Sequence, residues 1–143
     1  RIFYNDSACS IRRILTSKKK RNAIDFSDFV TTREEYFYIS GQLHWDINYN
    51  EDGYDNGIQR FWYENGQLAE EFNYEDGQRD GLYKKWYENG QLAEEFNYQD
   101  DKFHGLQKKW EENGQLIEER SYKDGSLLWK KCWDDKGEAI PCD

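Results

Sequence analysis

A stretch of 24 residues occurs three times in tandem, and this repetition constrains the fold more than any other feature of the chain. The three copies span residues 57–80, 81–104 and 105–128. The run at 62–74, WYENGQLAEEFNY, recurs letter for letter at 86–98. A short fixed period is typical of arrays in which each unit packs against its neighbours alone. The sequence therefore predicts a stacked array.

Two degenerate units flank the three copies. Residues 36–56 repeat the spacing of Gly and aromatic residues with one extra residue in the following loop, and residues 129–143 supply Trp133 and Gly137 at the repeat positions. Atypical end units act as caps in repeat arrays. We therefore expect a five-unit array over residues 36–143, preceded by a compositionally different segment at residues 1–35.

Each unit is predicted to be a β-hairpin, because Glu-Asn-Gly stands at 64–66, 88–90 and 112–114. Asn and Gly tolerate positive φ and mark hairpin turns. A three-residue loop with Gly66 in the left-handed conformation places Trp62 opposite Leu68. The same register places Arg60 opposite Glu70, Lys84 opposite Glu94 and Lys108 opposite Glu118, and all three pairs are opposite in sign. The predicted fold class is mainly β, an elongated single twisted antiparallel sheet of tandem hairpins.

Alternation along the strands then assigns two faces to the sheet. We expect one face to carry a continuous aromatic and aliphatic stripe. Its members are Ile58, Trp62, Leu68, Phe72, Tyr74, Leu82, Trp86, Leu92, Phe96, Tyr98, Leu106, Trp110, Leu116 and Tyr122. The opposite face is expected to be acidic and aromatic. Its members are Phe61, Tyr63, Glu71, Tyr83, Tyr87, Glu95 and Glu119.

Composition agrees with a thin sheet and limits the partners. Charged residues make up 34% of the chain and aromatic residues 17%, so apolar surface comes largely from rings that tolerate a half-wet face. The formal net charge of −9 favours a basic protein partner over nucleic acid. No run approaches the roughly 18 apolar residues that a membrane-spanning helix requires.

These units resemble the variant MORN repeat, with its Trp-Tyr-Glu-Asn-Gly-Gln-Leu core, aromatic-Asn-Tyr and downstream Gly, as found in bacterial YwqK-type antitoxin components. The resemblance covers about residues 36–140. The better-known MORN unit would carry Tyr-x-Gly-x-Trp, which is not seen here. The resemblance implies an elongated sheet of hairpins that acts as a binding surface. It also implies neutralisation of a toxin.

Residues 1–35 differ in charge from the rest of the chain, with eight Lys or Arg against five Asp or Glu. The spacing of Ile11, Ile14 and Leu15 predicts a short amphipathic helix that follows Ser10. We expect this segment to fold back over the aromatic stripe, with Phe26 and Phe29 as further anchors. The alternative is a flexible basic tail for a separate partner, or a nuclear-type signal at residues 18–21.

Candidate catalytic or metal-binding groups are few. His44 and His104 lie in different units, and the paired glutamates alternate between faces, so neither set converges on one substrate. The run from Asn48 to Gln59 approximates a calcium loop but lacks carboxylates at its first and twelfth positions. We therefore expect no enzyme activity, no cofactor and no metal.

Cys132 and Cys142 flank the last turn, and Cys132 is expected to face Ile140. The two cysteines either form a disulfide that closes the terminal hairpin or remain free thiols. Because disulfides persist mainly outside the reducing cytosol, this pair also bears on the compartment, which the sequence leaves open.

The predicted function is a non-catalytic protein-binding scaffold, in its most specific form an antitoxin or immunity protein. Tyr and Trp offer contact area at low entropic cost, and a negative field speeds encounter with a basic surface. The expected binding residues are Phe61, Tyr63, Glu71, Tyr83, Tyr87, Glu95 and Glu119. The alternative is a structural or assembly component of a larger complex, and the oligomeric state stays open.

Overall fold

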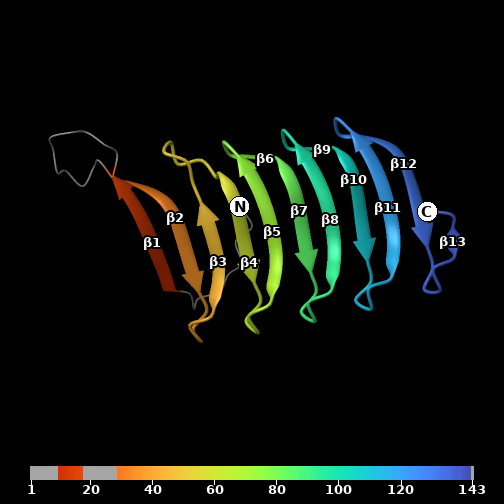
Figure 1. Cartoon of the computed structure of the whole chain (residues 1–143), viewed down its shortest axis with the longest axis horizontal. Coiled ribbons are helices and arrows are strands. Elements are labelled where there is room, and N and C mark those ends of the chain that lie inside the picture. Colours follow the sequence, from red (N-terminus) through yellow and green to blue (C-terminus); the bar gives the residue numbers. More distant parts are fainter. Residues whose placement is uncertain (1–9, 18–28, 143) are drawn as a thin grey trace.

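The chain forms one open antiparallel sheet of consecutive hairpins (Figure 1). The computed structural model describes residues 10–17 and 29–142, with backbone alone for 10–17, 29 and 30. The strands follow one another across the sheet in the order β1-β2-β3-β4-β5-β7-β8-β10-β11-β12-β13, and the short strands β6 and β9 pair with β5 and β8. The predicted array of hairpins is confirmed.

The bounds of the strands follow the repeat. They are β1 Ser10–Ser17, β2 Phe29–Phe37, β3 Leu43–Asn48, β4 Gly57–Trp62, β5 Leu68–Glu75, β6 Gln78–Arg79, β7 Gly81–Trp86, β8 Leu92–Gln99, β9 Lys102–Phe103, β10 Gly105–Trp110, β11 Leu116–Lys123, β12 Ser126–Trp133 and β13 Ala139–Ile140.

The Glu-Asn-Gly segments form the lower turns of Figure 1, between β4 and β5, β7 and β8, and β10 and β11. In the first turn, the Gly66 amide donates to the Tyr63 carbonyl, and the Tyr63 amide donates to the Gln67 carbonyl. Gly66 has φ of 87°, which a residue with a side chain rarely adopts. The expected three-residue loop and the pairing of Trp62 with Leu68 are therefore both present.

One residue beyond the turn, the register differs from the prediction. A β-bulge separates the Trp62–Leu68 pair from the next pair, so that Phe61 pairs with Glu70 and Arg60 pairs with Glu71 rather than Glu70. The same shift pairs Lys84 with Glu95 and Lys108 with Glu119. The extra residue of each bulge is Ala69, Ala93 or Ile117, and His44 occupies the equivalent position between β2 and β3.

The bulge also corrects the predicted faces, because a register shift of one residue exchanges the sides of a strand. Phe72 and Phe96 lie opposite Gln59 and Tyr83, on the other face from Trp62 and Trp86. Glu71, Glu95 and Glu119 lie on the tryptophan side, opposite Arg60, Lys84 and Lys108. The predicted acidic aromatic face is therefore divided between the two sides of the sheet.

The N-terminal prediction is wrong where the structure describes it. Ser10–Ser17 forms strand β1, not a helix, and β1 pairs with β2 at the end of the sheet rather than covering its aromatic rings. Strand β2 also crosses residue 35, so the change in composition there does not interrupt the sheet. Phe26 and the basic run at 18–21 lie outside the described residues.

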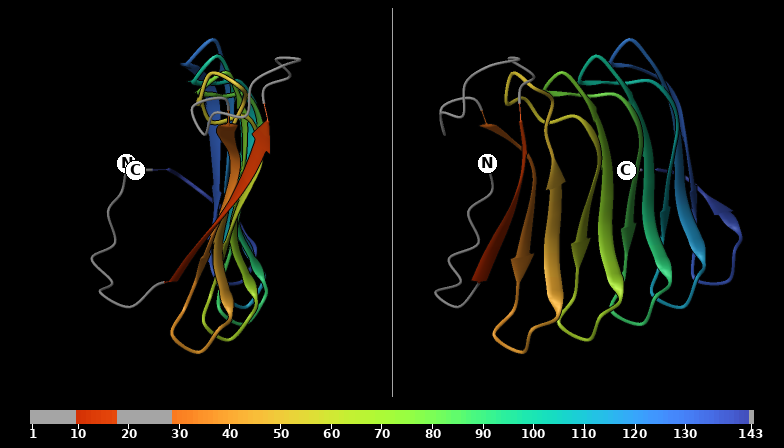
Figure 2. Two further views of the ribbon diagram at one scale, coloured as in Figure 1. Left: turned by 90° about the vertical axis from the view of Figure 1, so that its left-hand side faces the viewer. Right: turned by 60° about the vertical axis from the view of Figure 1, so that its left-hand side comes forward.

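The sheet is a single twisted layer, as the edge-on view of Figure 2 shows. Its buried apolar side chains, among the residues described, are Ile47, Ala69 and Ala93. Most other strand side chains are half-buried, because cross-strand neighbours cover their flanks and no second layer of described residues covers their tips. No described residue outside the sheet therefore covers either of its faces.

The last hairpin is closed covalently. A disulfide joins Cys132 to Cys142, whose Cα atoms lie 5.4 Å apart, and Cys132 pairs with Ile140 across β12 and β13.

Candidate binding surfaces

A row of exposed apolar side chains runs across one side of the sheet, which we call the aliphatic face. Ile58, Leu82 and Leu106 occupy the same register position in three successive units and are 41%, 42% and 47% exposed. Trp129, opposite Ser121, continues the row and is 38% exposed. Successive units lie two strand spacings apart, about 10 Å. The strands between these units place Asn73, Asn97 and Ser121 in the same row, so exposed apolar side chains alternate with small polar ones along a candidate interaction site.

A ladder of opposite charges lies beside this row. Arg60 Nε is 2.8 Å from Glu71 Oε2, Lys84 Nζ is 3.6 Å from Glu95 Oε2, and Lys108 Nζ is 4.0 Å from Glu119 Oε1. Half-exposed pairs of this kind contribute little to stability individually. Their effect is to balance the charge of the face, so that Glu71, Glu95 and Glu119 are partnered rather than free to attract a basic surface.

The opposite side, which we call the aromatic face, carries a band of packed rings. The Phe72 and Tyr83 rings are 4.8 Å apart between centroids, and Tyr83 and Phe96 are 5.4 Å apart. The band continues through Phe103 to Tyr122, whose rings are 5.3 Å apart. These distances lie in the range of favourable ring pairs. The rings are thus largely occupied with one another.

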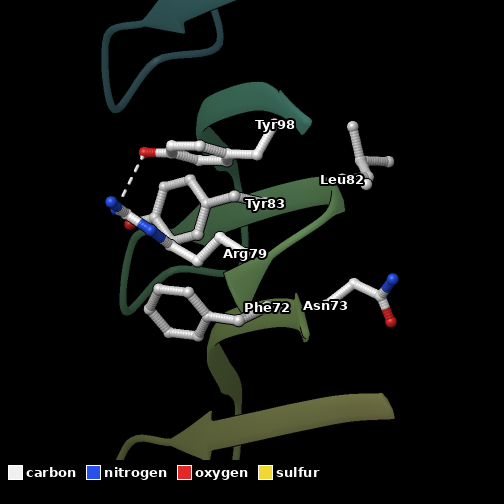
Figure 3. A pocket seen from close by; sticks show the side chains of 7 residues that line it. Phe72, Asn73, Arg79, Leu82, Tyr83 and Tyr98 are labelled. Carbon is white, nitrogen blue, oxygen red and sulfur yellow. Dashed lines mark hydrogen bonds between the residues drawn. The ribbon is translucent and has the colours of Figure 1, made fainter. Parts of the chain in front are cut away.

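Figure 3 shows the two faces at one point of the array: Phe72, Tyr83, Tyr98 and Arg79 lie on one side of the ribbon, and Leu82 and Asn73 on the other. The hollow among these side chains holds about 140 Å³ including open solvent, less than the pockets that usually hold small molecules. Burial, with Glu70 as the next cause, raises the pKa of Tyr83 far above its ordinary value.

Arg79 spans the hollow on the aromatic face. Its guanidinium carbon lies 4.5 Å from the centre of the Tyr98 ring, and Nη1 donates to the Tyr98 hydroxyl at 3.3 Å. Its backbone amide and Nε both donate to Asp101 Oδ1 at 3.0 Å. These bonds, the backbone one first, lower the pKa of Asp101. They also hold Asp101 at a positive φ of 61°, where the equivalent turns carry Gly77 and Gly125.

The expected binding residues do not form one surface. Phe61 and Tyr83 belong to the aromatic face, whereas Glu71, Glu95 and Glu119 belong to the aliphatic face. The Tyr63 and Tyr87 hydroxyls donate to the carbonyls of Trp86 and Trp110 in the next unit, at 2.7 and 2.8 Å. These two tyrosines therefore join neighbouring hairpins.

The acidic excess lies at the turns, along both long edges of the sheet. Exposed carboxylates at the lower turns of Figure 1 are Glu64, Glu88, Glu111, Glu112, Asp135 and Glu138, and those at the upper turns are Glu51, Asp52, Glu75, Asp76, Asp100, Asp101 and Asp124. Side-chain amides fix the lower turns in line, since Asn65 and Asn89 donate to the carbonyls of Glu88 and Glu112 at 3.1 and 3.0 Å. The negative field therefore surrounds both faces.

Sequence reasoning placed Ile58, Leu82 and Leu106 in a stripe with the phenylalanines, and so missed that they are an exposed row apart from the rings. The sequence feature that indicates the bulge is the small residue Ala at positions 69 and 93, where the crowded bulge leaves little room for a side chain. Charge pairing does not reveal the bulge, because two adjacent glutamates give each basic residue an acidic neighbour in either register.

The repeat geometry agrees with a known family of hairpin repeats. Three segments of the chain match the MORN repeat variant. They are residues 55–76, 79–100 and 103–124, together less than half of the chain. MORN repeats commonly serve as modules that bind proteins or membranes. That role agrees with a non-catalytic scaffold.

Other comparisons add little. No curated protein matches the chain significantly. One solved structure that matches, "Crystal Structure of TarM", has 13% sequence identity to this chain and a TM-score of 0.39. The match covers 75% of this chain and 19% of that one, so the chain spans about a fifth of the length of the structure it matches.

Within the described residues, no three His, Cys, Asp or Glu side chains are grouped closely enough to hold a metal ion. That part of the chain also has no helix that could span a membrane.

Proposed function

We propose that the chain is a non-catalytic scaffold that binds a basic protein through its aliphatic face. The observation that carries this proposal is the exposed row of Ile58, Leu82 and Leu106, repeated at one register position in three successive units. Since the repeat fixes the spacing, a partner that contacts one unit finds the same contact about 10 Å further on. A rigid row of this kind loses little entropy when it binds.

Charge supports the choice of a basic partner. The carboxylates at the turns flank the face, whereas its central ladder is balanced. A field of this form accelerates encounter with a positive surface without placing unpaired charge at the centre of the contact. The turns thus govern the rate of association, and the apolar row governs the affinity.

In its most specific form, this function is that of an antitoxin, which covers the working surface of a toxin. The support is the resemblance of the repeats to those of YwqK-type antitoxin components, together with the match to the MORN repeat variant. The alternative is an assembly component of a larger complex, and the observation that favours it is that β1 has a described strand partner on one side only.

A matched pair of substitutions tests the binding face. Leu82→Ser removes the middle member of the row, and Ile39→Ser removes an equally apolar side chain, 82% exposed, in the turn between β2 and β3. Partners captured from cells that express the chain would be identified and their affinity measured. We expect about a tenfold loss with Leu82→Ser, equivalent to about 1.4 kcal/mol, and no loss with Ile39→Ser. Equal affinities of the Leu82→Ser and Ile39→Ser variants for the partner would show that the aliphatic face is not the binding site.

The antitoxin form has its own test. Expression of the captured partner alone should arrest growth, co-expression with the wild-type chain should restore it, and co-expression with the Leu82→Ser variant should restore it less. A partner that is harmless alone would instead support the assembly role. Association that is insensitive to salt would contradict a basic partner.

A further inference from the structure

The charge ladder of the aliphatic face follows a rule within the repeats. Each basic residue lies between two acidic residues, one on each neighbouring strand. The sets are Arg60 between Asp46 and Glu71, Lys84 between Glu71 and Glu95, and Lys108 between Glu95 and Glu119. Strands with basic residues thus alternate with acidic strands across the sheet.

Lys131 of β12 is the next basic residue of this ladder, and its set is incomplete. It pairs with Glu119 on the inner side. On the outer side of β12, the described residues supply partners only for Cys132 and Trp133, from Ile140 and Ala139. The position that an acidic residue would occupy beside Lys131 therefore has no described strand.

Strand β13 stops short of that position for a structural reason. It ends at Ile140, and Pro141 follows, which has no amide hydrogen to continue a ladder. Cys142 then returns to Cys132 through the disulfide. The outer edge of β12 from Ser126 to Lys131 is consequently open among the residues described, and an open edge is a template for another strand.

The side chains of this edge favour a contact. Leu127 and Leu128 are 51% and 60% exposed, and Trp129 belongs to the exposed row of the aliphatic face. The Lys131 ammonium lies 4.9 Å from the centre of the Trp129 ring. An incoming strand would find apolar contact, a positive charge and unpaired backbone at one place.

The sign of the charge selects the occupant. A second copy of the chain offers the edges of β1 and β12, and both carry basic pairs, Arg12 with Arg13 and Lys130 with Lys131. Like charges placed opposite each other on neighbouring strands are unfavourable. Pairing between copies at these strands would bring basic sequences together, whereas a strand with adjacent acidic residues continues the ladder.

We propose that the open edge of β12 binds an acidic strand of another protein, which pairs antiparallel with residues 126–131 as an additional strand of the sheet. Backbone hydrogen bonds supply the contact, and an acidic residue beside Lys131 supplies the selectivity. This site is separate from the aliphatic face and does not depend on the function proposed for that face.

The test uses the sequence that fills the equivalent place inside the array. A peptide with the sequence of β8, LAEEFNYQ, is titrated into the intact, oxidised chain, and LAKKFNYQ serves as the charge control. We expect the acidic peptide to bind at least tenfold more tightly and to slow hydrogen exchange at residues 126–131. Equal binding of both peptides, or protection confined to β1, would overturn the proposal.

A charge exchange distinguishes strand pairing from general attraction. Lys131→Glu should lower the affinity for the acidic peptide at least tenfold and raise the affinity for the LAKKFNYQ peptide. Lys136→Glu, in the neighbouring turn, should alter neither affinity. An acidic peptide with alternate backbone amides N-methylated should lose binding, because it cannot donate to the edge. Unchanged binding after Lys131→Glu, or binding that survives N-methylation, would contradict the proposal. Circular dichroism of each variant verifies that the sheet is intact.

Discussion

Tyr38, Tyr63 and Tyr87 occupy one position in three successive units, and each hydroxyl donates to the carbonyl of a tryptophan in the next unit. The acceptors are Trp62, Trp86 and Trp110, at 2.9, 2.7 and 2.8 Å. An aromatic residue beside a turn is a reasonable candidate for partner contact on sequence grounds. The hydroxyl bonds show that these residues fasten one hairpin to the next, which a sequence read unit by unit does not reveal.

Replacement of Tyr87 by Phe should lower the free energy of unfolding by about 1 kcal/mol, because the Trp110 carbonyl loses its side-chain donor. Tyr54→Phe is the control, since Tyr54 is 59% exposed. Urea denaturation of both variants measures the difference. Equal midpoints would show that the hydroxyl bond contributes nothing.

Glu118 carries the clearest dependence on pH. Burial raises the pKa of its carboxyl, but bonds from Lys130 and Arg120 outweigh burial and leave the pKa below its ordinary 4.5. A carboxyl whose pKa is lowered by folding stabilises the fold above its unfolded pKa, and this contribution is lost as the pH falls through the folded pKa. Its effect is therefore present at neutral pH and absent in strong acid.

Glu118→Gln should accordingly cost about 1–2 kcal/mol at neutral pH and little at about pH 2. Denaturation at both values measures the cost, with Glu64→Gln in an exposed turn as the control. A cost that does not change with pH would mean that the loss comes from packing rather than from charge.

At the scale of the hairpin, the turn was predictable and the bulge was not. Glu-Asn-Gly fixes a three-residue loop because Gly66 and its equivalents have positive φ. The bulge one residue later has no comparable signature. Arg60 meets a glutamate whether it faces Glu70 or Glu71, so cross-strand charge could not decide the register. That single residue accounts for the division of the predicted binding surface between two faces.

Glycine substitutions separate two demands of the turns. Gly90 has φ of 84°, and a Cβ there would lie 2.7 Å from Gln67 Oε1, whereas Gly53 has the same φ and no atom within 4 Å. Gly53→Ala should cost about 1 kcal/mol from the backbone alone, and Gly90→Ala more, because the Gln67 side chain must also move. Thermal unfolding of the two variants gives the comparison. An equal loss would place the whole cost in the backbone.

At the scale of the molecule, the sheet is a one-dimensional array in which each strand contacts its neighbours in the sheet. The repeat period predicts the architecture of the array, but it does not predict strand β1. Ile11, Ile14 and Leu15 have a spacing that suits a helix, yet the open edge of β2 provides partners for the backbone of residues 10–17. Backbone pairing with a neighbouring strand therefore decides the structure of this segment, rather than the local spacing of three apolar residues.

One-dimensional packing predicts that damage stays local. Reduction of the Cys132–Cys142 disulfide should speed amide exchange at Ala139 and Ile140 and leave the exchange of β3 unchanged, because β13 pairs with β12 alone. Hydrogen exchange with mass spectrometry, with and without reductant, measures both regions. Faster exchange across the whole sheet would contradict the array.

The division of each repeat into an aliphatic and an aromatic face is the claim on which the proposed binding surface rests. A nuclear Overhauser spectrum tests it directly through the ring protons of Phe72. We predict contacts from the Phe72 ring to Tyr83, whose ring centroid lies 4.8 Å away, and none to the side chain of Ile58, which lies on the other face. Contacts from Phe72 to the Ile58 side chain, which a register without the bulge would place opposite Phe72, would contradict the bulge and both faces derived from it.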